Sequence, residues 1–87
     1  MTYIVASANE LDAKFETYEE ACACAQSMRR EGIEAAIVTS DDHWHLWSVC
    51  KTGMTTPLVV GARSADEAIV VARGITNDYN LDTVQCR

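Results

Sequence analysis

Chemically reactive side chains gather in one short run of this 87-residue sequence, Asp41–His45. Alternate side chains of an extended segment share a face, so the imidazoles of His43 and His45 could chelate a metal ion, with Asp41 adding a carboxylate. Catalytic zinc usually takes three protein ligands and a supporting shell of hydrogen bonds, which no other part of the sequence clearly supplies. We therefore expect no metal and no cofactor, and we interpret both histidines as solvated side chains beside a turn.

The sequence contains four cysteines, Cys22, Cys24, Cys50 and Cys86. Cys22 and Cys24 point about 200° apart on a predicted helix, so they cannot pair with each other. Cys50 would need a neighbouring base to act as a nucleophile, but strand alternation places both histidines on the opposite face. Nothing resembling a signal peptide precedes the first predicted strand. We therefore predict free thiols in a cytoplasmic protein, and we expect no enzyme and no catalytic residue.

Charge further limits the function. The chain carries 13 acidic and 7 basic residues, a formal net charge of −6. This imbalance disfavours direct binding of nucleic acid or of an anionic membrane surface, because both attract basic faces. No stretch approaches the roughly 18 consecutive apolar residues of a membrane-spanning helix. The acidic residues that could instead face a basic protein partner are Glu10, Asp12, Glu16, Glu19, Glu20, Asp41 and Asp42. The alternative is that the acidic cluster of the first half serves solubility and the charge of a helix N-terminus.

Two segments 47 residues apart share the same helix-start signal. Thr17 and Ser64 are N-cap residues, and a glutamate, Glu20 or Glu67, follows each of them three positions later. Each pair is expected to form a capping box, in which the hydroxyl accepts from the glutamate N–H and the carboxylate reaches back to the cap. The predicted helices are Tyr18–Glu31 and Ala65–Asn77. Val70 points away from the apolar stripe of the second helix, so we expect it to be exposed.

Alternating β-branched and aromatic residues predict the strands. The predicted strands are Thr2–Ala6, Ile33–Thr39, His43–Cys50 and Leu81–Cys86, with a short extra strand at Leu58–Val60. Only Ser40–Asp42 separates the second strand from the third, so we expect an antiparallel hairpin between them. The order predicts an α+β fold of ferredoxin-like βαββαβ type, a single-layer antiparallel sheet with both helices on one face. Residues 1–87 would form one domain of two similar halves, about 1–40 and 41–87.

The alternation in His43–Cys50 predicts which side of this strand faces solvent. Trp44, Leu46, Ser48 and Cys50 share one face, which we expect to pack under the helices. The other face carries His43, His45, Trp47 and Val49, and it would belong to the bare side of the sheet, an interaction surface. Tryptophan is enriched at binding hot spots, so we expect Trp47, with His43 and His45, to contact a partner. The alternative is that Trp47 packs only within the chain.

The run Phe15-Glu16-Thr17-Tyr18-Glu19-Glu20-Ala21 follows a short strand and precedes Ala25 and Gly32. It resembles the F-x-T-x-E-E-A helix start of small phage-encoded proteins, and anti-CRISPR inhibitors include acidic α+β proteins of this size. The resemblance covers part of the chain and transfers no functional residue. It also implies no specific partner. Our first hypothesis is a non-catalytic protein-binding module, a phage-type inhibitor whose acidic surface would occupy a basic nucleic-acid-binding groove of a CRISPR-type defence complex. Carboxylates would replace phosphates there and steer association.

A second hypothesis is a ferredoxin-like regulatory or small-ligand-binding domain that acts as a homodimer through a sheet edge. A glycine-rich loop at the first strand–helix junction would support this hypothesis, but Ser7–Asp12 contains no glycine. The two hypotheses differ in solution behaviour. A monomer that joins a basic partner in a salt-sensitive way indicates the inhibitor, and a salt-insensitive dimer indicates the regulatory domain.

Overall fold

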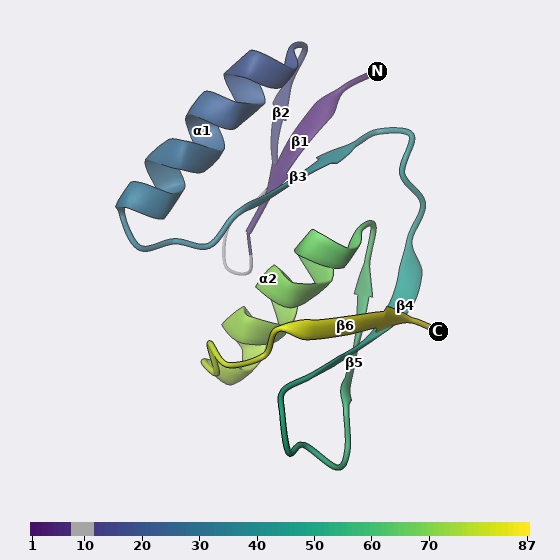
Figure 1. The fold of residues 1–87 in the computed structure, drawn as a ribbon. Coiled ribbons are helices and arrows are strands. Elements are labelled where there is room, and N and C mark those ends of the chain that lie inside the picture. The colour runs from purple at the N-terminus through teal and green to yellow at the C-terminus, as the bar shows by residue number, and fades with distance from the viewer. Residues whose placement is uncertain (8–11) are drawn as a thin grey trace.

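The computed structural model describes residues 1–7 and 12–87, which form two helices and six strands (Figure 1). In chain order the elements are β1 (Tyr3–Ala6), β2 (Ala13–Phe15), α1 (Tyr18–Arg30), β3 (Ala36–Thr39), β4 (His45–Cys50), β5 (Leu58–Ala62), α2 (Ala65–Thr76) and β6 (Thr83–Cys86). The α+β class is therefore confirmed, and the order is roughly compatible with a ferredoxin-like arrangement. The extra strand expected near residue 58 is present as β5, whereas β2 was not expected.

The strands form two three-stranded antiparallel sheets, with orders β2-β1-β3 and β5-β4-β6, where a single sheet was expected. Each half of the chain thus has the same ββαβ path, and its first strand is central. The expected hairpin between β3 and β4 does not form. A strand has only two edges, and β4 uses both of them to pair with β5 and β6. Pairing within each half therefore replaces pairing between the halves.

Both helices begin at the residues that the capping signals predict. Thr17 Oγ1 accepts from the N–H of Glu20 at 3.3 Å, and Ser64 Oγ accepts from the N–H of Glu67 at 3.1 Å. The return bonds of the expected capping boxes differ, because neither carboxylate accepts from the N–H of its own N-cap residue. Glu20 accepts from the Thr17 hydroxyl at 2.9 Å, and Glu67 accepts from the Arg63 N–H at 2.7 Å. Each helix therefore starts at a hydroxyl cap, and its glutamate bonds a neighbouring group instead of the N–H of the cap residue.

Each half has its own hydrophobic core. In the first half, α1 packs small residues, Ala21 and Ala25, against Val5 of the central strand, and all three are fully buried. In the second half, the fully buried residues are Val49, Ala62, Ala68, Ala72 and Leu81. Alanine at the helix–sheet contact lets each helix lie close to its strands, so the sheets can be small and still exclude water.

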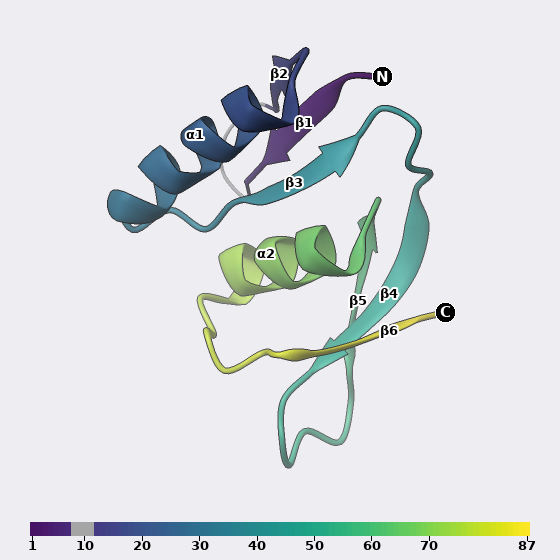
Figure 2. The same ribbon diagram turned by 45° about the horizontal axis from the view of Figure 1, so that its top comes forward.

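Helix α2 lies between the two sheets. Its Ala68 packs on the second sheet, and Val70, about 200° further around the helix, is also buried. The expectation that Val70 is exposed is therefore wrong, because α2 also contacts β3 of the first sheet. In Figures 1 and 2, α1 and α2 lie on either side of β3. The layers follow as α1, first sheet, α2 and second sheet, in place of two helices on one face of one sheet.

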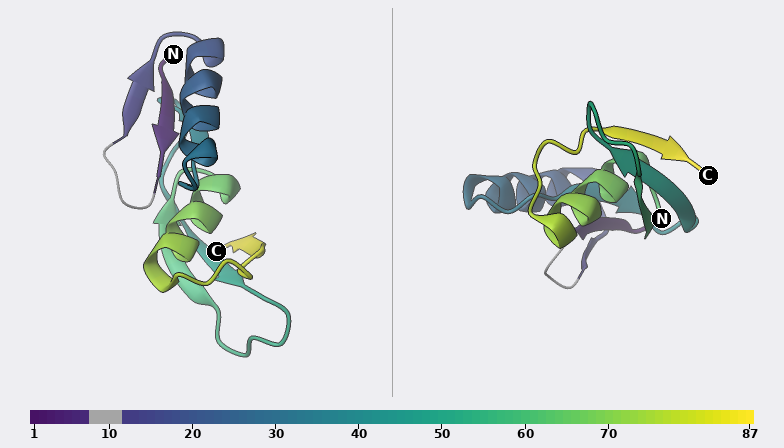
Figure 3. Two further views of the ribbon diagram at one scale, coloured as in Figure 1. Left: turned by 90° about the vertical axis from the view of Figure 1, so that its left-hand side faces the viewer. Right: turned by 90° about the horizontal axis from the view of Figure 1, so that it is seen from below.

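Between described residues, two ion pairs join the halves, and in both the arginine comes from the second half. Arg63 contacts Asp12 at 3.0 Å, and Arg73 contacts Glu34 at 2.6 Å. The molecule is elongated, with extents of 40 × 28 × 17 Å, because the two sheets follow each other along its long axis (Figure 3). Part of the acidic excess of the first half therefore serves contacts within the chain.

Candidate protein-interaction surface

Five of the predicted acidic site residues gather at one end of the first sheet. The register places Tyr3 opposite both Phe15 and Thr39, so the segments that follow β2 and β3 leave the sheet at the same end. These segments carry the exposed residues Glu16, Glu19, Glu20, Asp41 and Asp42. Two of them also have local structural roles, because the Asp42 carboxylate accepts from the Thr39 N–H at 2.8 Å and the Glu20 carboxylate accepts from the Thr17 hydroxyl. We call these five exposed residues the acidic end; they lie on the segments that follow β2 and β3 and on the first turn of α1.

The remaining two predicted acidic residues do not join this group. Asp12 pairs with Arg63, and Glu10 lies outside the described residues. Hydrogen bonds to Glu67 above all, and then to Asp12, raise the pKa of the Arg63 guanidinium above its ordinary value, although partial burial acts in the opposite direction. Glu67 is the one buried charged residue in the described part of the chain, 2% exposed. Asp12 thus belongs to a structural network and offers little free charge to a partner.

The predicted faces of β4 are reversed in the structure. Val49 is fully buried, and Trp47 packs against the second core while its Nε1 donates to Ala62 O at 2.9 Å. Trp44 and Leu46, expected in the core, are 64% and 57% exposed. Both faces of this strand are apolar, so the alternation alone could not determine which one α2 covers. Trp47 therefore packs within the chain, which was the alternative interpretation.

Strand register defines the uncovered side of the second sheet. Along β4, Leu46 lies beside Gly61, Ser48 lies between Val59 and Gln85, and Cys50 lies beside Thr83. We call these seven residues, Leu46, Ser48, Cys50, Val59, Gly61, Thr83 and Gln85, the outer face. None of them is charged, and Leu46 and Val59 (41% exposed) are its large apolar side chains. An uncovered face with exposed aliphatic residues is a candidate contact surface.

Trp44 extends this surface, although it was assigned to the core from the sequence. It directly precedes β4, and its ring centroid lies 4.7 Å from Cζ of Arg63. Because Arg63 also contacts Glu67 and Asp12, a cation–π contact connects the exposed indole to a fixed network. An ordered, exposed tryptophan is the type of residue that dominates binding energy in protein interfaces. The signal available in the sequence was the position of Trp44 directly after a polar turn.

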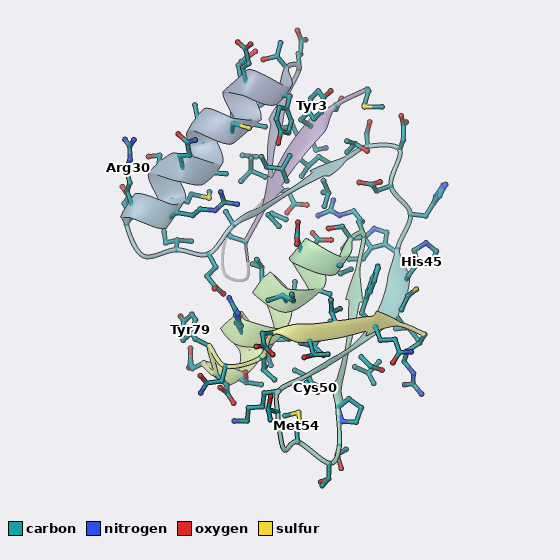
Figure 4. All side chains as sticks on the ribbon, viewed as in Figure 1. Tyr3, Arg30, His45, Cys50, Met54 and Tyr79 are labelled. Carbon is teal, nitrogen blue, oxygen red and sulfur yellow. The ribbon has the colours of Figure 1, made fainter. Side chains whose placement is uncertain are left out.

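The two histidines lie within the exposed run of residues 41–46. His43 and His45 are both exposed, and Figure 4 shows His45 beside β4. In the described ranges 1–7 and 12–87, no group of three or more His, Cys, Asp or Glu side chains could hold a metal ion. Residues 41–46 are all exposed, so they form a continuous path from the acidic end to the outer face.

Other polar groups of the second half have structural roles. Lys51 pairs with Asp78, and hydrogen bonding to Lys51, followed by that to Asn80, lowers the pKa of the Asp78 carboxyl below its ordinary value. All four cysteines are free thiols; Cys86 is exposed and the other three are partly buried. Of the helices in the described segments, neither has the length and apolar character needed to cross a membrane.

Comparison with known proteins adds no relative: no family model, no curated protein and no solved structure matches this chain. A functional assignment therefore depends on the surfaces themselves.

Proposed function

We propose that this protein is a non-catalytic protein-binding module that docks through the outer face together with Trp44 and the acidic run Asp41–Asp42. The observation that carries the proposal is the uncovered second sheet, on which Trp44 and Leu46 are more than half exposed. Burying such apolar side chains against a partner is favourable by about 25 cal/mol per Å². No helix or strand of the described chain covers this face.

The outer face is too small to form a stable interface alone, so we expect the partner to contact the acidic end as well. Three strands about 4.8 Å apart and up to six residues long present roughly 300 Å², whereas a stable interface usually buries about 800 Å² on each partner. The continuous exposure of residues 41–46 offers the additional contact. With a net charge of −6 and acidic residues beside the apolar face, the best-matched partner has a basic rim around an apolar pocket.

A finer form of the proposal concerns what this partner normally binds. The acidic end and the resemblance to acidic phage-encoded inhibitors support a partner whose basic surface is a nucleic-acid-binding groove, as in a CRISPR-type defence complex. Binding should then weaken as salt increases, and it should compete with the partner's nucleic acid. Competition with short oligonucleotides, added to the isolated complex, tests this finer form separately from docking itself.

The test uses two matched variants that each place a glutamate at an exposed aliphatic position. Leu46 lies on the outer face, and Ile75, 66% exposed, lies at the end of α2. Immobilised wild-type protein, L46E and I75E are incubated with host lysate, and the retained proteins are quantified. The proposal predicts a partner that L46E retains at least about tenfold less than wild type, the size expected for a contact worth 1–2 kcal/mol. Equal retention by L46E and I75E would remove the outer face from the proposal.

A second pair of variants tests the acidic end. Glu19 lies in the first turn of α1, and Glu31 is the exposed C-cap residue at its other end. E19K should weaken binding of the captured partner and reduce its salt dependence, whereas E31K should do neither. If both variants bind as wild type does, the acidic end plays no part and the docking surface is reduced to the apolar face.

The second candidate is the homodimeric regulatory domain. The absence of charge on the outer face favours it, because two copies of an acidic chain could stack there without repulsion. The limited area of that face argues against it as a stable dimer. Sedimentation equilibrium distinguishes the two: we expect a monomer, and a dimer that L46E dissociates would favour the regulatory domain.

A further inference from the structure

The outer edge of β3 has one open position. In the pairing of β1 with β3, the N–H of Ser40 donates to Thr2 O at 2.8 Å. Because hydrogen-bonded pairs alternate in an antiparallel ladder, Val38 and Ala36 point their backbone groups toward β1. The N–H and C=O of Ile37 therefore point away from β1, toward the free edge of the first sheet.

Side chains close the two neighbouring positions on this edge. Arg29 Nη2 donates to Ala35 O at 2.9 Å, and Asp42 Oδ2 accepts from the Thr39 N–H. The Asp42 N–H also donates to Thr39 O at 3.1 Å. These contacts protect β3 against pairing with another long strand. Among the described residues, no group hydrogen-bonds to the outward N–H or C=O of Ile37, so a single rung of β-pairing stays open.

This rung lies in a groove of about 240 Å³. The groove is lined by Tyr18, Cys22, Gln26 and Arg29 of α1, by Ala36 and Ile37 of β3, and by Asp66 of α2. The α1 residues are spaced at intervals of three and four, so they form one continuous wall along the helix. Ligand pockets for drug-sized molecules usually hold about 300–1,000 Å³, so this groove suits a short ligand.

The charged groups of the groove keep hydrogen-bonding capacity for a ligand, because the bond from Arg29 Nη2 to Ala35 O uses one N–H of a guanidinium that carries several. Arg29 and Asp66 form no ion pair with any other described residue. The fork of an arginine matches a carboxylate, which it binds through two parallel hydrogen bonds. Asp66 on the other side balances this charge, and the combination fits one carboxylate on an otherwise neutral chain better than it fits a polyanion.

We propose that this groove binds the carboxyl terminus of an extended peptide. One ligand residue pairs its N–H and C=O with Ile37, as in β-strand addition. In the antiparallel orientation the ligand runs from the Thr39 side toward the Ala35 side, so its C-terminal carboxylate arrives at Arg29. Both backbone groups of Thr39 are bonded to Asp42, and Ala35 O accepts from Arg29, so among these described residues Ile37 alone offers both groups to a ligand, which suits a chain end better than an internal strand.

The test titrates the ¹⁵N-labelled protein with four acetylated tripeptides that end in Ala, Val, Leu or Phe. Each is used with a free carboxylate and as its C-terminal amide. We expect at least one free-carboxylate peptide to shift the Ile37 amide resonance in a saturable way and to slow its hydrogen exchange. The matched amide should bind at least about tenfold more weakly, because the charge-assisted bonds to Arg29 are lost. The proposal would be overturned if none of the four free-carboxylate peptides bound, or if the C-terminal amides bound as tightly as the free carboxylates.

Neighbouring arginines provide the matched variants. Arg29 lines the groove, whereas Arg30 is exposed at the end of α1 and extends away from β3 (Figure 4). R29Q should lose at least about tenfold in peptide affinity, and R30Q should bind as wild type does. R29K keeps the charge without the fork and should bind with intermediate affinity. Equal loss in R29Q and R30Q would show that net charge, and no defined site, attracts the peptide.

This inference goes beyond the proposed docking function and is independent of it, since the groove lies on the first sheet and the outer face on the second. L46E should leave peptide binding unchanged, and R29Q should leave capture of the partner unchanged. Failure of one proposal is therefore distinguishable from failure of the other.

Discussion

Replacing Arg63 by methionine should destabilise this protein more than replacing Lys51 or Arg73, which form more exposed ion pairs. The Arg63 and Glu67 side chains are only 9% and 3% exposed, and the Arg63 guanidinium also contacts Asp12 of the other half. R63M leaves the Glu67 carboxylate buried, with the Arg63 backbone N–H as its remaining partner. Removing one member of a buried pair costs about 3–5 kcal/mol. A domain of this size is stable by about 5–15 kcal/mol in total, so R63M would lose a large fraction of its stability.

Urea unfolding followed by far-UV circular dichroism measures this loss, since tryptophan fluorescence would also report the changed contact with Trp44. With a slope of about 1 kcal/mol per M for a small domain, the midpoint should fall by about 3–5 M or to near zero denaturant. The double variant R63M/E67M removes both charges and should recover most of the loss, because an apolar pair of similar volume often replaces a buried ion pair at little cost. R73M is the matched control: Arg73 and Glu34 are more exposed, and the loss of this pair together with the Arg73 Nε bond to Leu81 O should cost about 1–2 kcal/mol. Equal losses for R63M and R73M, or no recovery in the double variant, would refute the reasoning.

Three further predictions test other parts of the structure. Leu81 is fully buried and Leu46 is exposed, so L81A should cost about 2–5 kcal/mol and L46A less than about 0.5 kcal/mol in urea unfolding; similar costs would contradict the burial of Leu81 in the second core and the exposure of Leu46. The lowered pKa of Asp78 means that its pair with Lys51 stabilises the fold above the ordinary carboxyl pKa of 3.8 and that this contribution is lost as the pH falls through the lowered value; K51M should return the Asp78 pKa to its ordinary range in an NMR titration, and an unchanged pKa would exclude Lys51 as the cause. Gly32 follows α1 with φ +83° and open space around its Cβ position, so G32A should destabilise by about 1 kcal/mol through backbone strain alone, and a stabilised G32A would contradict the left-handed conformation.

The helices were predictable because their signals are local. A hydroxyl and a glutamate three residues apart fix the start of α1 at Thr17 and of α2 at Ser64, and these contacts lie within one turn. The division into two sheets was not predictable, because strand pairing depends on which distant segment occupies each edge. β2 was missed for a further reason: it has only three residues, and its centre is Lys14.

The sequence predicted the exposure of the acidic residues in the candidate site, but it did not predict which apolar residues are exposed there. Glu16, Glu19 and Asp41 are exposed, as isolated acidic residues usually are. The two faces of β4 could not be ranked from the sequence, because Trp44 with Leu46 and Trp47 with Val49 are nearly equal in apolar character. The buried face of β4 is the one that α2 covers, and the residues of β4 do not determine where α2 lies. The burial of Val70 could not be predicted for the same reason, because it depends on contact with β3 of the other half.

The most direct test of the docking surface observes Trp44 itself. Incorporation of 5-fluorotryptophan gives one ¹⁹F resonance for each of the two tryptophans, W44F assigns them, and the signal comes only from the labelled chain. We predict that the Trp44 resonance in the free protein shows the large H₂O-to-D₂O shift of a solvated indole and that it loses this shift on addition of the captured partner, while the Trp47 resonance changes little. A Trp44 resonance that is already shielded in the free protein, or that stays solvated in the complex, would contradict docking through this face.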